Sequence, residues 1–166
     1  MNHIIFILLI LLSGLSAQGQ NLLKFDSLGN KIAEGDTING TMTFWYPDGQ
    51  TKVTGFMKNS TPDRTWNYFS VSGKLILTEI YRNGTKYINK RITYFKNDSI
   101  QEIQTLRTEG ELHNRSVKVY RDGIMFYPNG QLSLDAHFLN GKDTGSRYWN
   151  KKGKEITREE WMKIND

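Results

Sequence analysis

The sequence has 166 residues, of which 37% are hydrophobic and 12% aromatic, a composition typical of one folded globular domain. Its 22 basic and 17 acidic side chains give a net charge of +5, but they are scattered and form no basic stripe that would track nucleic-acid phosphates. Cysteine is absent, which excludes disulfides, thiolate metal sites and a cysteine nucleophile.

The first element is an N-terminal apolar segment. Nine apolar residues run from Ile4 to Leu12, and Ala17-Gln18-Gly19 supplies the small residues of a cleavage site. This pattern predicts a signal peptide over residues 1–19, and an uncleaved anchor is the alternative. We therefore expect an exported protein that is periplasmic, associated with the outer envelope or secreted. After cleavage, residues 20–166 form a single domain with no transmembrane segment.

A repeat organises the rest of the chain. The phrases FWYPDG and MFYPNG end in Gly49 and Gly130, and four more positions align with them: Gly29, Gly73, Ser99 and Gly153. Every copy has an aromatic residue four positions earlier, namely Phe25, Trp45, Phe69, Phe95, Phe126 and Trp149. A second turn, with an Asn-Gly-like pair, follows eleven residues after the first column in five copies. The predicted repeat cores are 24–40, 44–60, 68–84, 94–110, 125–141 and 148–164.

The turn residues predict β-hairpins. In Tyr46-Pro47-Asp48-Gly49, proline presets the first turn position and glycine accepts the left-handed conformation, as in a type I turn with a glycine bulge. Between the turns, apolar and polar residues alternate, which is typical of strands. In this geometry, we expect the constant aromatic to share a face with the residues two and four positions after the glycine. The predicted fold is therefore all-β.

Three segments depart from the repeat. Residues 100–110 space their aliphatic residues three apart, which suits a helical turn as well as a strand, and the repeat register favours a strand. The insertion 111–124 is expected to contribute an extra strand around residues 117–121. At the end, Thr157 and Glu160 match a capping box, with Trp161 and Ile164 on one face. A short helix there would cap the last hairpin.

The phrases FYPNGQLSLDAHFLNGKDTGSRYW and WYPDGQTKVTGFMKN resemble a MORN-repeat variant of bacterial exported proteins, often labelled YwqK-type antitoxins. The resemblance covers about residues 24–156. It implies that the hairpins stack into an elongated, twisted antiparallel sheet, and that the protein binds and neutralises another protein. Two units, around residues 61–64 and 85–88, lack the second glycine of the family pattern.

No set of catalytic residues can be assembled from the sequence. His113 and His137 are the only histidines after residue 19, and the chain has no HExxH, G-x-S-x-G or phosphate-loop motif. The carboxylates of Glu79 and Asp135 lie in different repeats, and Glu159 and Glu160 point apart on a helix. We therefore expect no enzyme, cofactor or metal site.

Five tyrosines flank the constant aromatic column by one residue, which predicts that they line the opposite sheet face: Tyr46, Tyr68, Tyr94, Tyr127 and Tyr148. Tyrosine offers a large amphipathic contact area, so this row is the candidate binding face. The leading hypothesis is a non-enzymatic protein-interaction module, a scaffold or antitoxin-like protein with an unidentified protein partner. A carbohydrate- or cell-envelope-binding module is the alternative, and a lipid surface ranks last.

Overall fold

The fold is known from a computed structural model, which describes residues 20–110 and 117–165. The predicted signal peptide and His113 lie outside the described residues.

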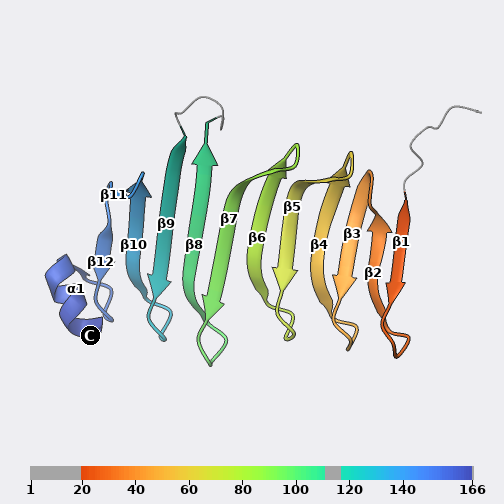
Figure 1. Cartoon of the computed structure of the whole chain (residues 1–166). Coiled ribbons are helices and arrows are strands. Elements are labelled where there is room, and N and C mark those ends of the chain that lie inside the picture. The colour runs from red at the N-terminus through yellow and green to blue at the C-terminus, as the bar shows by residue number, and fades with distance from the viewer. Residues whose placement is uncertain (1–19, 111–116, 166) are drawn as a thin grey trace, which may run out of the picture.

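Thirteen strands of the described residues form one sheet, in which each strand lies beside the next along the chain, except that β12 pairs with β10 because the short β11 lies off this path (Figure 1). All pairs are antiparallel, and β1 and β13 occupy opposite ends of the strand order, so the sheet is open. One helix follows in the described part of the chain, at the β13 end. This arrangement confirms the all-β fold of stacked hairpins. The elements are β1 (Asn21–Phe25), β2 (Lys31–Asp36), β3 (Gly40–Trp45), β4 (Thr51–Lys58), β5 (Thr61–Phe69), β6 (Leu75–Arg82), β7 (Thr85–Tyr94), β8 (Ile100–Glu109), β9 (Lys118–Phe126), β10 (Leu132–Leu139), β11 (Lys142–Asp143), β12 (Arg147–Trp149), β13 (Glu155–Ile156) and α1 (Arg158–Asn165).

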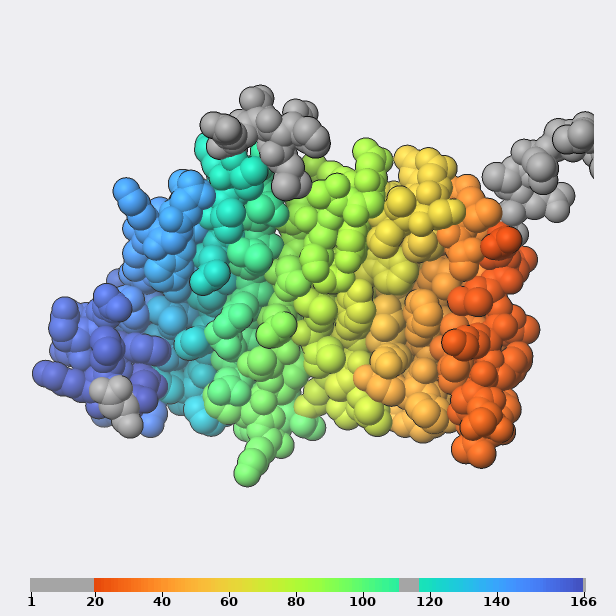
Figure 2. All heavy atoms as spheres, viewed as in Figure 1, coloured from red at the N-terminus to blue at the C-terminus, as the bar shows by residue number. Residues whose placement is uncertain are grey.

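The sheet is a single layer whose side chains spread over a broad slab (Figure 2). Among the described residues, the buried hydrophobic side chains are only Ala33, Met42, Ile92, Tyr127 and Ala136. Most other strand residues are half-buried, because each touches its cross-strand neighbours but no second layer. Stability therefore rests on strand pairing and on cross-strand side-chain pairs, each of which contributes about 0.2–1 kcal/mol.

The glycine-column turns confirm the predicted bulged hairpins. The N–H of Gly49 donates to the carbonyl of Tyr46 at 2.9 Å, and Gly49 has a φ of 85°. The pairing register shifts between Phe44 and Trp45, as a bulge requires. All six turns of this kind lie at the same ends of the strands, at the bottom of the sheet in Figure 1.

The fourth unit is shifted by one residue from its predicted alignment. Asp98, with a φ of 70°, takes the place of the turn glycine, and its N–H donates to the carbonyl of Phe95 at 3.0 Å. Aspartate tolerates this left-handed conformation better than most residues. Tyr94 therefore occupies the constant aromatic position, paired with Ile100, and the assignment of Phe95 and Ser99 to the repeat columns is wrong.

The predicted grouping of side chains around each bulge also needs correction. Trp45 pairs with Thr51, but Phe44, its neighbour on the strand, pairs with Val53 because the register skips Lys52. The extra residue thus places Val53, four positions after Gly49, opposite Phe44. Phe44 is the residue that precedes the constant aromatic, Trp45. Neighbours on a strand face opposite sides, so the aromatic does not share a face with that aliphatic residue.

The second set of turns confirms the Asn-Gly prediction at residues 59–60, 83–84 and 140–141, whereas at 39–40 it is wrong, because neither residue there has a positive φ. Asn83 and Gly84 have φ values of 48° and 77°, and Asn140 and Gly141 have 49° and 82°. Two successive positive φ values define the type I′ turn, whose twist suits a hairpin. Such turns also bond to the neighbouring hairpin: the N–H of Gly84 donates at 3.1 Å to the carbonyl of Pro62, which lies in β5 just after the preceding turn.

The central segments form two long strands. β8 confirms the strand assigned by the repeat, since it pairs with β7 on one side and β9 on the other. Its Ile103 and Leu106 face opposite sides, which a single-layer sheet tolerates because neither face is sealed. Residues 118–121 do not make an extra strand, because β9 runs without a break from Lys118 to Phe126.

The C-terminal helix forms where the capping box predicts it. The Thr157 N–H donates to Glu160 Oε2 at 2.8 Å, and the Glu160 N–H donates to Thr157 Oγ1 at 3.2 Å. Trp161 donates from Nε1 to Ser133 Oγ at 2.8 Å. Ile164, predicted on the same helix face as Trp161, is 42% exposed. The helix replaces the second turn of the sixth unit and packs beside β12.

Candidate functional site

One row of cross-strand partners crosses the sheet and defines what we call the hollow face. Each member is the register partner of the next: Ala33, Phe44, Val53, Tyr68, Leu77, Arg91, Gln104, Gly123 and Ala136. Directly paired residues point to the same side. The row is apolar as far as Leu77 and changes character at Arg91. The hollow face therefore has two chemically different halves.

The first half contains an apolar hollow of about 750 Å³. Phe44, Val53, Trp66 and Tyr68 line it, from β3, β4 and β5, and Leu22 of β1 lies at its outer end. Gly55 makes room for the indole, because a Cβ on Gly55 would lie 2.1 Å from Trp66 Cδ2. The Trp66 Nε1–H donates to the carbonyl of Phe56 at 3.2 Å, which fixes the ring. This surface suits an apolar or aromatic ligand group.

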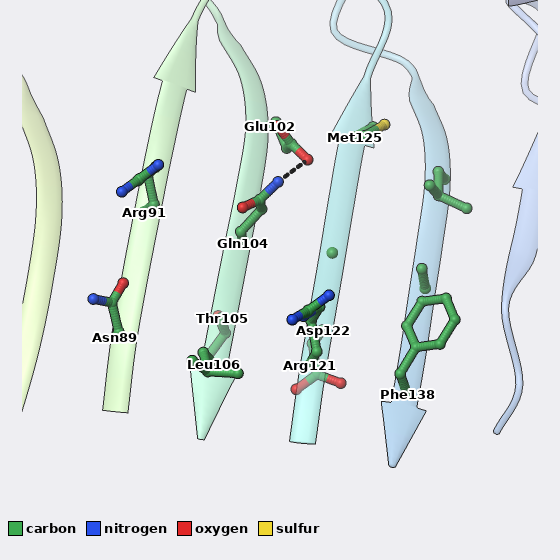
Figure 3. A pocket seen from close by; sticks show the side chains of 13 residues that line it. Asn89, Arg91, Glu102, Gln104, Thr105, Leu106, Arg121, Asp122, Met125 and Phe138 are labelled. Atoms are coloured by element: carbon green, nitrogen blue, oxygen red, sulfur yellow. Dashed lines mark hydrogen bonds between the residues drawn. The ribbon is translucent and has the colours of Figure 1, made fainter. Parts of the chain in front are cut away.

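The second half contains an arginine hollow of about 470 Å³, between β7 and β10 (Figure 3). Arg91 and Arg121 border it, and among the described residues neither guanidinium forms a salt bridge. Gln104 lies between them and donates to Glu102 Oε1 at 2.8 Å. The apolar lining comes from aliphatic side chains and a thioether together with one aromatic ring: Leu106, Met125, Leu134, Ala136 and Phe138.

A buried carboxylate stands at the boundary of the two halves. Glu79 is 7% exposed and accepts hydrogen bonds from the hydroxyls of Tyr68 and Tyr81 at 2.8 and 2.9 Å. Lys86 Nζ donates to its other oxygen at 2.7 Å. Burial raises the pKa of Glu79, but these hydrogen bonds outweigh it, so the pKa is lowered. Burial and the Glu79 carboxylate raise the pKa of Tyr81 to about 12. The Glu79 carboxylate thus accepts three hydrogen bonds, which suits a residue that holds neighbouring strands together and not a site of proton transfer.

The five candidate tyrosines occupy three different kinds of position. Tyr46 and Tyr127 lie in turns, and their hydroxyls donate to the carbonyls of Phe69 and Trp149 in the following units, at 2.8 and 2.9 Å. Tyr94 takes the constant aromatic position and donates to the Leu75 carbonyl at 2.8 Å. The structure therefore does not bring the five into one row.

The other two tyrosines lie on the hollow face, but on distant strands, Tyr68 on β5 and Tyr148 on β12. Tyr68 lines the apolar hollow, and Tyr148 packs on Trp161 with ring centroids 5.6 Å apart. Tyr148 pairs with Leu134, next to the arginine hollow. Tyr68 and Tyr148 each precede the constant aromatic residue of their unit and so lie on a strand. Tyr46 and Tyr127 follow that residue and lie where the turn has begun.

His137 lies on the opposite face, between two carboxylates. Its Nδ1 is 2.8 Å from Asp122 Oδ1, its Nε2 is 3.0 Å from Asp135 Oδ1, and Arg147 donates to Asp135 Oδ2 at 2.9 Å. The hydrogen bond to Asp122, supported by Asp135, raises the pKa of His137, although burial opposes this. In the described part of the chain, no group of three or more His, Cys, Asp or Glu side chains could hold a metal ion.

A family model described as MORN repeat variant matches residues 38–59, which contain β3, β4, the turn between them and part of the turn on either side. The match supports a MORN-repeat protein, and MORN repeats are generally non-catalytic modules for contacts with proteins or membranes. No curated protein matches the chain. None of the helices in the described ranges is long and apolar enough to cross a membrane.

Sequence reasoning missed the two hollows. The lining residues belong to rows of cross-strand partners that run over many strands. Such a row can be traced only when the position of every β-bulge, and so the register of every strand pair, is known. Arg91 and Arg121 lie thirty residues apart in the sequence and carry no repeat signature. The one-residue shift of the fourth unit, which puts Glu102 where other units have an aliphatic residue, contributes to the polar half. Tyr94, an aromatic residue one position before Phe95, is the signal in the sequence for that shift.

Proposed function

We propose that this protein is a non-enzymatic, exported interaction module, a scaffold or antitoxin-like protein, that binds a protein partner on the hollow face. The observation that carries the proposal is the division of that face into an apolar hollow and an arginine hollow along one row of partners. A protein segment with an apolar side chain at one end and carboxylates at the other would complement both halves. The repeat match is compatible with this role.

The proposed location follows from the apolar N-terminal segment, which resembles a signal peptide. Cells that express the full chain with a C-terminal tag test it. Periplasmic, outer-envelope or secreted protein with an intact mass that corresponds to removal of residues 1–19 would support export. A chain retained in the cytoplasm with its full mass would contradict it.

Site-specific photocrosslinking tests the binding face. A photoreactive residue at Gln104 probes the hollow face, and one at Glu34, also an exposed strand position, probes the opposite face. We expect the Gln104 probe to capture one exported protein that the Glu34 probe does not. Capture of the same proteins from both faces, or of none from Gln104, would contradict a partner on the hollow face.

The second candidate is a carbohydrate- or envelope-binding module, favoured by the aromatic rings in the apolar hollow. Trp66 and Tyr68 line that hollow, and aromatic rings give sugars a broad apolar stacking surface. Because four of the five candidate tyrosines donate their hydroxyls within the chain, such binding would rely on the rings. Binding to isolated cell-wall polymer should then survive Tyr68→Phe but be lost in Tyr68→Ala and in Trp66→Ala, whose rings line the hollow. Unchanged binding in the alanine variants would exclude this role.

A further inference from the structure

The two ends of the sheet are built differently. At the C-terminal end, β11 and β13 have two residues each, and α1 packs beside β12. At the N-terminal end, β1 is a five-residue strand that, within residues 20–110 and 117–165, has a partner on one side only (Figure 1). A strand edge with unpaired N–H and C=O groups is a template for another strand. The sheet therefore has one edge suited to extension.

The outward groups of β1 follow from its pairing with β2. The Thr37 N–H donates to the Gln20 carbonyl at 3.1 Å, and the register continues without a shift as far as Lys24. Hydrogen-bonded pairs alternate along an antiparallel ladder, so Leu22 and Lys24 bond to β2. The N–H and C=O groups of Asn21, Leu23 and Phe25 consequently point away from the sheet.

Equivalent positions elsewhere in the chain show what this edge lacks. The carbonyls of Phe69 and Trp149, at the same repeat position as Phe25, accept hydroxyl hydrogen bonds from Tyr46 and Tyr127 in the preceding units. Among the described residues, no unit precedes Phe25. The side chains at this edge are also exposed apolar groups, with Leu23 57% and Phe25 51% exposed.

We propose that two copies of this chain pair through β1, antiparallel and centred on Leu23, to form a two-fold dimer with one continuous sheet. This register places Leu23 opposite Leu23 of the second copy and Asn21 opposite Phe25, so that the three outward residues of each strand bond to one another. Lys24 faces Leu22, and no like charges lie directly opposite. The dimer closes at two copies because the other end of each sheet offers only two-residue strands and the helix.

The pairing has a consequence for the candidate site. Leu22 and Lys24 of β1 line the apolar hollow, which lies beside the edge. The dimer would bring the apolar hollows of the two copies next to each other across the two-fold axis. An extended partner, or a partner that is itself a dimer, would then contact both hollows. The self-association does not depend on the proposed export or on the partner.

Sedimentation velocity of the purified chain over a range of concentrations gives the first test, with the N-terminus established from the intact mass. We expect a concentration-dependent shift to twice the monomer mass. The Leu23→Pro variant removes the outward N–H but none of the bonds to β2, so it should remain monomeric with an unchanged far-UV circular dichroism spectrum. Leu23→Ala keeps the N–H and should still dimerise. A wild-type monomer at all concentrations, or a Leu23→Pro dimer, would overturn the proposal.

Cysteine crosslinking tests the register even if Leu23→Pro fails to fold. The native chain has no cysteine, so each variant carries one thiol. Leu23→Cys should form a disulfide-linked dimer under mild oxidation, because the two residues face each other at the axis. Leu28→Cys is the control, since Leu28 is 83% exposed but lies beyond the paired segment. Equal crosslinking of the two variants, or linkage of Leu23→Cys to another protein in place of its own copy, would overturn the proposed dimer.

Discussion

The two halves of the hollow face share one backbone plan but differ in chemistry. Around β3 to β5 the face carries aromatic rings over a glycine, whereas between β7 and β10 it carries two arginines over a glycine and an alanine. The hairpin turns are of the same kind in both halves. The repeat therefore specifies the sheet through its turn residues. The strand positions that the repeat pattern leaves variable decide what each half can bind.

The largest expected effect is a difference in stability between alanine substitutions at the two glycines of the hollow face, Gly55 and Gly123. Gly55→Ala should lower the free energy of unfolding by about 3 kcal/mol, because the new Cβ would overlap the fixed ring of Trp66. Gly123→Ala is the matched control, since a Cβ there meets no atom within 4 Å. Chemical denaturation with tryptophan fluorescence measures both. Equal losses would show that the indole does not constrain the first half more tightly than the second.

A smaller effect is expected at the boundary of the halves. Glu79→Gln should cost about 2 kcal/mol, because two tyrosine hydroxyls and Lys86 lose a charged acceptor. The folded-state pKa of Glu79 is lowered from 4.5, so its contribution is present above that pH and is lost as the pH falls through the folded value. Denaturation from pH 7 to pH 3 should therefore show a steeper loss in the wild type than in the variant. Parallel curves would contradict the lowered pKa.

The tyrosine ties between turns give a third comparison. Tyr127→Phe should cost about 1 kcal/mol, since the ring is 4% exposed and its hydroxyl bonds to the Trp149 carbonyl. Tyr46→Phe removes the equivalent bond in the first half, where the residue is less buried, and should cost less. Urea midpoints of the two variants measure the difference. A larger loss for Tyr46→Phe would reverse the expected order.

The smallest effect concerns His137, on the face opposite the hollows. Its pKa is raised by Asp122 and Asp135, so it stabilises the fold below its ordinary value of 6.5 and the contribution is lost as the pH rises through the folded value. The wild type should lose slightly more stability between pH 6 and pH 9 than His137→Gln does. If the variant shows the same decrease, another group is responsible for it.

The fold could be predicted from the sequence to the extent that turn chemistry dictates it. Glycine at the bulge and Asn-Gly at the opposite turn have few alternative conformations, so the hairpins around Gly49 and Gly84 are set locally. The capping helix was predictable for the same reason, because Thr157 and Glu160 bond to each other's backbone.

The candidate site could not be predicted in this way, because it depends on register accumulated over many strands. A single displaced turn, with Asp98 in place of the assumed Ser99, reverses which side chains of its hairpin face the hollows. The arginine hollow joins residues from β7 to β10, and no local pattern connects Arg91 with Arg121. Similarly, the exposure of Ile164 follows from where α1 meets β12, which periodicity alone does not set.

The neighbour-only pairing of the hairpins has an evolutionary consequence. Because the close contacts between elements join strands adjacent in the sheet, a duplicated hairpin could be inserted between two others without repacking of a central core. Each insertion would lengthen the hollow face by one pair of strands and add new unconstrained positions. Length and ligand preference could thus diverge quickly among descendants of one ancestral unit, while the turns stay recognisable.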